Sequence, residues 1–266
     1  MPSVDRLRAP AKLTRSLRVV GTRDDGYHLL EAEMVSLDLA DELEIELGED
    51  GFEVLDELEL VGGESVLGAV VPPGSDNLVL KALEAVGLRA RVRLKKRIPA
   101  GAGLGGGSSD AAAVLRWAGV FDAQLAVGLG ADVPFCLVGG RALVTGVGEQ
   151  VEPLGFEAFT AVLVTPALSV STPEVYRTWD ALGGPLGEFG NDLEPAAVAL
   201  QPRLRWWRDL VSAVAGEAPR LAGSGGTWYL ERDTRQAGHL VAELAGAVRA
   251  EHEKALVVAA SAIPRL

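Results

Sequence analysis

The chain has 266 residues, of which 48% are hydrophobic and 23% are charged. This is an ordinary mixture for a globular protein; it argues against extensive disorder, and the length allows one large domain or two small ones that share a cleft. The formal net charge is −12, which disfavours a nucleic-acid partner because an acidic surface repels phosphate backbones. A phosphorylated ligand would therefore need a local positive site.

Cysteine and histidine are scarce. Cys136 is the only cysteine, which excludes an intrachain disulfide and a cysteine-based zinc site, and the apolar residues around it indicate a buried, inert thiol. With only three histidines, a structural metal is not expected either. The sequence has no apolar stretch long enough to span a membrane and no apolar core of a signal peptide near residue 1, so we expect a cytoplasmic protein without membrane association.

The first part of the chain is dominated by expected strands. Alternation of polar and apolar residues, or a continuous apolar character, predicts strands over residues 11–20, 41–47, 53–61 and 89–95. Residues 21–26 form the turn after the first of these strands. Residues 77–86 have apolar positions at helical spacing, with Asp76 as the expected cap.

The second part mixes helices and strands. Helices are expected over residues 109–117, 173–179, 204–214 and 234–249, and strands over residues 141–145, 158–164, 227–231 and 256–260. Residues 130–135 are expected to form a short loop, and residues 221–226 a glycine-rich turn. Because strands and helices do not alternate regularly, the pattern favours an α+β fold over a doubly wound parallel sheet.

The strongest functional signal is the segment over residues 99–110, which reads Pro-Ala-Gly-Ala-Gly-Leu-Gly-Gly-Gly-Ser-Ser-Asp. Its glycines let backbone N–H groups turn toward a bound anion, and a helix that starts near Ser108 adds its positive N-terminal end. The hydroxyl groups of Ser108 and Ser109 could donate hydrogen bonds or bind Mg²⁺. The segment therefore predicts the phosphate site that an acidic chain needs.

Two other glycine-rich motifs fit this segment less well. Gly101-x-Gly-x-x-Gly106 formally matches the dinucleotide fingerprint, but the strand before it, residues 91–97, is rich in arginine and lysine rather than buried and apolar. A Walker loop would place a lysine after Gly106, where this chain has Gly107. A flexible linker is disfavoured by the rigid Pro99 at the entry and the alanine-rich helix at the exit.

Residues 99–115 resemble the phosphate loop of the galactokinase, homoserine kinase, mevalonate kinase and phosphomevalonate kinase superfamily. Within it, the match is closest to the 4-diphosphocytidyl-2-C-methyl-D-erythritol kinases of non-mevalonate isoprenoid biosynthesis. Further segments resemble motifs of these kinases in the same order, at residues 9–13, 25–30, 130–135 and 223–226. The resemblance implies a two-lobed kinase fold, with an ATP-binding lobe over residues 1–150, a second lobe over residues 151–266 and the active site in the cleft between them.

The resemblance also implies a reaction. The γ-phosphate of ATP, with Mg²⁺, would move to the 2-hydroxyl group of 4-diphosphocytidyl-2-C-methyl-D-erythritol. Asp132 would orient the acceptor hydroxyl and accept its proton, Lys12 would pair with Asp132, and Ser108 would bind the metal. The residues implied in ATP binding are Pro99, Ala100, Gly101, Ala102, Gly103, Leu104, Gly105, Gly106, Gly107, Ser108 and Ser109.

The acceptor end is assigned in the same way. Tyr27 and His28 would recognise the cytosine, with Tyr176 stacking from the other side and Lys96 contacting the same end. The residues implied in acceptor binding are Tyr27, His28, Lys96, Asp132, Thr172 and Tyr176. Asn191 and Asp192 also resemble positions near the acceptor.

Taken alone, these residues also suit plainer roles. Lys12 could be an edge-strand lysine that reaches water, Asp132 a helix cap or turn aspartate, Tyr27 a core residue and His28 a turn histidine. Gly223 to Gly226 would shape the cleft rather than take part in chemistry.

The chain departs from the family pattern at several points. Thr14 and Arg15 stand where relatives have asparagine and an apolar residue, the segment over residues 117–130 is short, and Trp228 replaces a small residue. Three other functions therefore stay open: another kinase of the superfamily, a nucleotide-binding relative without activity, and a nicotinamide-dependent oxidoreductase, which the basic strand disfavours. The expected partner is a small molecule with a cytidine diphosphate moiety, bound by a monomer or homodimer.

Overall fold

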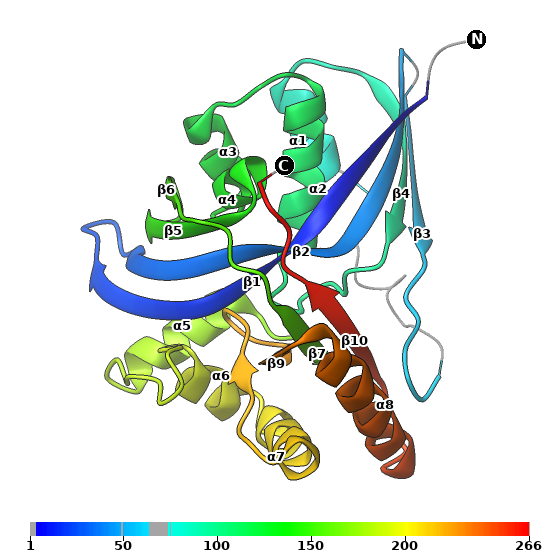
Figure 1. Cartoon of the computed structure of the whole chain (residues 1–266). Coiled ribbons are helices and arrows are strands. Elements are labelled where there is room, and N and C mark those ends of the chain that lie inside the picture. Colours follow the sequence, from blue (N-terminus) through cyan, green and yellow to red (C-terminus); the bar gives the residue numbers. More distant parts are fainter. Residues whose placement is uncertain (1–3, 49, 64–73, 75, 266) are drawn as a thin grey trace.

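The computed structural model describes residues 4–48, 50–63, 74 and 76–265, and within them the chain forms two sheets (Figure 1). The first sheet contains β1 (Asp5–Thr22), β2 (His28–Leu47), β3 (Gly51–Asp56), β4 (Ala90–Lys96), β5 (Arg141–Gly146) and β6 (Gln150–Pro153). Its order is β3-β4-β2-β5-β6, with β1 paired to β2. Only β3 and β4 run parallel, and the other described pairs of both sheets are antiparallel.

The second sheet follows in sequence. It contains β7 (Thr160–Pro166), β8 (Arg220–Leu221), β9 (Trp228–Arg232) and β10 (Ala255–Ser261), in the order β10-β7-β9-β8. The chain thus passes from one sheet to the other between β6 and β7, whereas the boundary expected between residues 150 and 151 lies inside β6. The expected α+β class is confirmed.

Eight described helices form two groups (Figure 1). In Figure 1 the first group lies above the middle of β1 and β2: α1 (Leu78–Ala85), α2 (Gly106–Trp117), α3 (Ala123–Leu129) and α4 (Val133–Val138). The second group lies below them, beside the second sheet: α5 (Thr172–Ala181), α6 (Glu194–Leu200), α7 (Arg203–Ala215) and α8 (Thr234–Ala250). Among the described residues, no helix combines the length and apolar character needed to cross a membrane.

Several expected boundaries were wrong, each for a local reason. Asn77 caps α1 in place of Asp76, because its side chain accepts a hydrogen bond from the Val79 N–H group. The loop expected over residues 130–135 ends at Asp132, because α4 begins at Val133 and tolerates a proline in its first turn. The segment between residues 117 and 130 contains α3, capped by Asp122.

The two longest strands, β1 and β2, pair along most of their length but lose register near Pro10. Pro10 pairs with Ala40, whereas Lys12 pairs with Ser36, so β2 has three residues where β1 has only Ala11. This irregularity leaves backbone groups of β1 free to bind elsewhere. Lys12 N–H donates to the Leu104 carbonyl at 2.9 Å, and the Pro10 carbonyl accepts from the Ser109 hydroxyl at 2.7 Å.

A buried apolar cluster joins the two sheets to the glycine-rich segment over residues 101–107. It includes residues of β1, β7 and that segment that are all 2% exposed or less: Ala11, Leu13, Ala102, Leu104, Ala161 and Leu163. Burying one leucine side chain contributes roughly 2 kcal/mol. The apolar residues of the glycine segment therefore anchor it in the core.

Arg15 links the two sheets through carboxylates. Its guanidinium lies 2.9 Å from Glu231 on β9, 2.7 Å from Glu33 on β2 and 3.0 Å from Glu157. The side chain is only 14% exposed and lies over the ring of Phe159. Arg15 therefore connects the two sheets at a position where an apolar residue was expected.

We expect Arg15→Ala to lower the free energy of unfolding by about 2 kcal/mol, because Glu231 loses its nearest cation and Glu33 and Glu157 keep only Arg141. Arg6 is the matched control, since its side chain is 83% exposed and lies 3.7 Å from Glu44. Arg6→Ala should change the free energy by less than about 0.5 kcal/mol. Urea unfolding measures both, and equal effects would contradict this role of Arg15.

Candidate active site

A cavity of about 500 Å³ lies where the glycine segment, β1 and α5 meet. Many of the residues that line it are ones that the sequence predicts for the site. They include Lys12, Thr14, Lys96, Pro99, Ala100, Gly101, Ala102, Gly103, Gly105, Gly106, Gly107, Ser108, Asp132, Thr172 and Tyr176. Tyr27, His28, Leu104 and Ser109 are not among the described wall residues.

Along the glycine segment, residues with positive φ angles alternate with residues that do not have them. Gly101, Gly103 and Gly105 have φ angles of +70°, +75° and +67°, in the left-handed region that favours glycine, whereas Ala102 and Leu104 do not have positive φ. Such alternation brings successive N–H groups to one concave side, a shape that binds anions. The side chains of Ala102 and Leu104 are buried on the other side.

A second glycine-rich turn, residues 222–226, supports the segment from behind. A Cβ atom on Gly103 would lie 2.6 Å from the Gly225 carbonyl oxygen, and one on Gly226 would lie 2.6 Å from the Gly101 carbonyl oxygen. The Thr227 hydroxyl donates to the Ala102 carbonyl at 2.7 Å. The two turns therefore pack backbone against backbone, which only glycine allows.

Helix α2 begins at Gly106, before the expected start near Ser108. Its cap residue, Gly105, provides no side-chain hydrogen bond, and Ser109 N–H makes the first intrahelical bond, to Gly105. The N–H groups of the first helical turn therefore lack intrahelical partners at the edge of the cavity. Together with the concave backbone before it, this helix start forms an anion site.

Lys12 and Asp132 meet in the cavity wall. Lys12 Nζ lies 3.2 Å from Asp132 Oδ2 and donates to the Thr14 hydroxyl at 3.1 Å. Lys12 is 5% exposed, so the carboxylate and the hydroxyl offset the cost of burying its charge. The pairing that the resemblance implied is present, and the Thr14 hydroxyl supplies a second oxygen to the ammonium.

Asp132 occupies the cap position of α4 but does not act as a cap. Its side chain makes no capping hydrogen bond, although its backbone precedes the helix. The carboxylate is instead directed to Lys12, and it is 32% exposed. A plain capping role therefore does not account for this aspartate.

Lys96, which we expect to contact the cytosine end of the acceptor, lines the cavity at the end of β4. Its ammonium is held there by Asp41 and Asp110. All three side chains are at most 4% exposed. Asp41 also accepts from the N–H groups of Arg97 and Ile98, so the cluster joins β2, β4 and α2.

The cluster contains two acids and one base, and this shifts their protonation. Burial, partly offset by the Lys96 charge and reinforced by Asp41, raises the pKa of Asp110 to about 7. Burial would lower the pKa of Lys96, but Asp110 and Asp41 outweigh that effect and raise it. Oδ1 of Asp110 has no hydrogen-bond partner in the described structure. Asp41 has no local signal in the sequence, because it stands in the alternating pattern of β2 like any polar strand residue.

The hairpin between β1 and β2 brings His28 to α5. The His28 ring stacks on Tyr176 with the ring centres 4.9 Å apart, and Nε2 lies 2.8 Å from an oxygen of Asp180. Tyr27 is 62% exposed, beneath the guanidinium of Arg23, so it is not a core residue. Asp180 lies 152 residues from His28 in the sequence, so nothing near either residue indicates their contact.

Other predicted residues have structural partners. The Thr172 hydroxyl lies 2.7 Å from that of Ser224, another wall residue of the cavity. Asn191 donates to the Leu221 and Gly223 carbonyls and so holds the second glycine turn. Asp192 binds Arg18.

Cys136 is buried in α4, as expected. It is 4% exposed, and burial raises the pKa of its thiol to about 12. A thiol that stays protonated at neutral pH is a poor nucleophile, so Cys136 contributes to packing rather than to chemistry.

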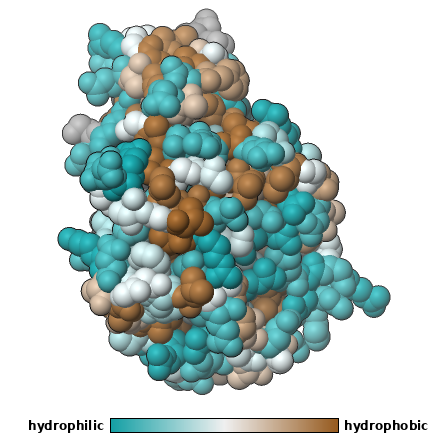
Figure 2. Space-filling view, turned by 90° about the vertical axis from the view of Figure 1, so that its left-hand side faces the viewer, coloured by the Kyte–Doolittle hydropathy of each residue, from teal (hydrophilic) through white to brown (hydrophobic). Residues whose placement is uncertain are grey.

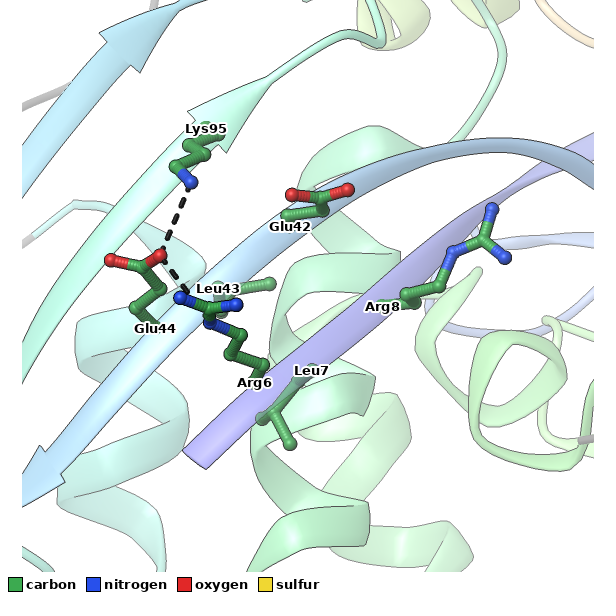
Figure 3. Close-up of a pocket in the computed structure, with 7 residues that line it drawn as sticks. All are labelled: Arg6, Leu7, Arg8, Glu42, Leu43, Glu44 and Lys95. Carbon is green, nitrogen blue, oxygen red and sulfur yellow. Dashed lines mark hydrogen bonds and ion pairs between the residues drawn. The ribbon is translucent and has the colours of Figure 1, made fainter. Parts of the chain in front are cut away.

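A second cavity, of about 280 Å³, lies on the outer face of the first sheet (Figure 3). Figure 3 shows Glu44 between Lys95, at 3.2 Å, and Arg6, at 3.7 Å, in a cross-strand row of opposite charges. This row resembles a solvated sheet face.

Figure 2 shows another face of the molecule, on which hydrophilic side chains surround smaller groups of apolar ones. We therefore place the candidate site at the glycine segment.

We expect Gly103→Ala to disrupt the contact between the two glycine turns. The new Cβ would overlap two carbonyl oxygens, so the free energy of unfolding should fall by more than about 2 kcal/mol and nucleotide affinity by at least about tenfold. Gly119→Ala is the control, because Gly119 has φ of +70° with nothing within 4 Å of its Cβ position. Its cost should be about 1 kcal/mol, with normal nucleotide binding. Urea unfolding and calorimetry would distinguish them, and equal losses would contradict the close packing.

The raised pKa of Asp110 predicts a pH dependence. Between about pH 4 and pH 7 the folded protein binds a proton at Asp110 that the unfolded chain has lost, so this group makes stability fall as the pH rises. The free energy of unfolding of the wild-type protein relative to Asp110→Asn should therefore decrease by more than about 1 kcal/mol between pH 5 and pH 8. Urea unfolding at both pH values measures it; an unchanged difference would refute the assignment.

Comparisons with known proteins agree with this geometry. The family model described as GHMP kinases N terminal domain matches residues 77–140, which include the glycine segment and Asp132. A 4-diphosphocytidyl-2-C-methyl-D-erythritol kinase from Paracoccus denitrificans is 37% identical over 250 residues, which cover 86% of this chain and 87% of that protein.

Solved structures share the fold. A crystal structure of 4-(cytidine 5'-diphospho)-2C-methyl-D-erythritol kinase has a TM-score of 0.73 and 34% identity, over 97% of this chain and 99% of that one. A homoserine kinase from Cytophaga hutchinsonii, at 17% identity, has a TM-score of 0.65 over 100% of this chain and 96% of its own. The resemblance seen in the sequence is thus confirmed: the chain belongs to the 4-diphosphocytidyl-2-C-methyl-D-erythritol kinase family of the GHMP kinases, which transfer phosphate from ATP to an alcohol group.

Proposed function

We propose that this chain phosphorylates the 2-hydroxyl group of 4-diphosphocytidyl-2-C-methyl-D-erythritol with ATP. The single observation that carries the proposal is that the Lys12–Asp132 pair and the anion site at the start of α2 line one cavity. A phosphoryl donor and an alcohol bound there would be held next to each other. The names of the relatives give the acceptor.

The backbone supplies the donor site. The concave N–H groups of residues 101–107 and the first turn of α2 would hold the phosphates of ATP, so that a chain with net charge −12 needs few basic side chains there. Leu104 and Ser109 would contribute indirectly, since their side chains hold the segment to β1 and the core.

Asp132 would orient the acceptor alcohol and accept its proton as the bond to phosphorus forms. A carboxylate with a third of its surface exposed to the cavity is placed for this role. Lys12 would keep the carboxylate in position and offset the negative charge that develops on the transferred group. Most of the rate enhancement would come from such positioning.

Mg²⁺ would be held mainly by the phosphates of the nucleotide. The described residues contain no group of three or more histidine, cysteine, aspartate or glutamate side chains suited to a metal, so a protein cage is not built. Mg²⁺ commonly binds through one or two protein oxygens together with substrate phosphates, and the Ser108 hydroxyl in the cavity wall fits such a ligand. The ion would neutralise charge on the phosphate oxygens.

The cytidyl group would bind near the contact between the hairpin and α5. Tyr176 lines the cavity, and the ring of His28 stacks on its ring. The exposed ring of Tyr27 is available to stack on a base. Thr172, also in the wall, would contact the acceptor. We omit Lys96 from this group because its ammonium is occupied by two carboxylates.

We expect Asp132→Ala to lower kcat by about 10²- to 10⁴-fold, since the acceptor hydroxyl loses its proton acceptor, while ATP affinity changes only a few-fold. Coupled ADP release with the cytidyl acceptor measures turnover, and calorimetry measures ATP binding. The exposed Asp209 on α7 gives the control, because Asp209→Ala should behave as wild type.

Retained turnover in Asp132→Ala would remove this residue from the mechanism. A wild-type protein that releases ADP with other alcohols but not with the cytidyl acceptor would instead refute the substrate. A protein that binds ATP and turns over no acceptor would be a relative without activity.

A further inference from the structure

His28 is held by three side chains from one face of α5. Its ring stacks on Tyr176, meets the edge of Trp179 with the ring centres 5.5 Å apart, and places Nε2 2.8 Å from Oδ1 of Asp180. The three residues follow the spacing i, i+3 and i+4, which puts them on one side of a helix. Trp179 is itself fixed, because its Nε1–H group donates to the Pro185 carbonyl at 2.9 Å.

The position of Asp180 is not explained by the helix. It lies in the last turn of α5, where the negative end of the helix dipole disfavours a carboxylate. Its side chain is 54% exposed, yet it bonds to an imidazole that is only 10% exposed and 152 residues earlier in the chain. The contact joins α5 to the β1–β2 hairpin and orients the ring of His28.

This contact determines which nitrogen of a neutral His28 carries hydrogen. A carboxylate only accepts hydrogen bonds, so the ring must donate to Asp180 through Nε2–H. Nδ1 then has no hydrogen and acts as an acceptor. Among the described residues, no side chain or backbone group donates to Nδ1.

We propose that Asp180 is a positioning residue that holds His28 with its hydrogen on Nε2, so that Nδ1 selects a pyrimidine with an exocyclic amino group. The inference rests on the proposed function. Cytosine presents an N4 amino donor where uracil presents an O4 acceptor. Nδ1 would pair with the amino group, but would oppose its lone pair to that of O4 and leave both groups without partners.

The tautomer is measurable without substrate. The chain has three histidines, and nitrogen-15 NMR of the full chain at pH 8 distinguishes the protonated from the unprotonated ring nitrogen of each. We expect His28 to have hydrogen on Nε2 alone in the wild-type protein, and a mixture of both tautomers in Asp180→Ala. Glu174→Ala, which removes an exposed acid from the same helix, should leave the spectrum of His28 unchanged. A wild-type His28 with hydrogen on Nδ1, alone or together with Nε2, would overturn the proposal.

The selection is measured with two acceptors, the cytidyl compound and its uridyl analogue. We expect wild-type kcat/KM to favour the cytidyl acceptor at least about 100-fold, and Asp180→Ala to reduce this ratio at least about tenfold through KM, with kcat within about twofold. The same ratio in both proteins would refute the role of Asp180. If the wild-type protein turned over neither acceptor, both the proposed function and the selection would be refuted. The NMR experiment would still show whether Asp180 fixes the tautomer of His28.

Discussion

Strands β1 and β2 stop pairing regularly between Pro10 and Lys12, and the backbone groups released there hold the phosphate loop. One N–H group bonds to the Leu104 carbonyl and one carbonyl accepts from Ser109. The same irregularity sets the side chain of Lys12 in the cavity wall, beside Asp132. The position of the anion site and that of the Lys12–Asp132 pair thus depend on one of the three register shifts between β1 and β2.

An acidic protein that binds a triphosphate must offset the repulsion between its own negative charge and that of the ligand. Here the positive field comes mostly from oriented backbone N–H groups, and the nearby lysines are neutralised: Lys12 by one aspartate and Lys96 by two. Because a dipole needs no counterion, it can be desolvated at lower cost than an ammonium. The cations then serve to place carboxylates and strands, while the loop backbone would contact the phosphates.

The parts of the site that are contiguous in sequence could be predicted. The glycine segment carries its conformational requirement in its own residues, and the α+β class follows from the order of the elements. The partners of Lys96 could not be predicted in the same way, because Asp41 is 55 residues away and looks like any polar residue of an alternating strand. The contact of His28 with Asp180 depends on the docking of α5, although the spacing of Tyr176, Trp179 and Asp180 was a signal that could have been noticed.

The apolar anchors of the loop have a consequence for how ligands enter and leave. Ala102 and Leu104 are buried among residues of both sheets, and the second glycine turn fills the space behind them. A loop anchored in this way cannot swing aside as a lid. Its shape is fixed by these contacts, so an anion that bound there would order little further backbone.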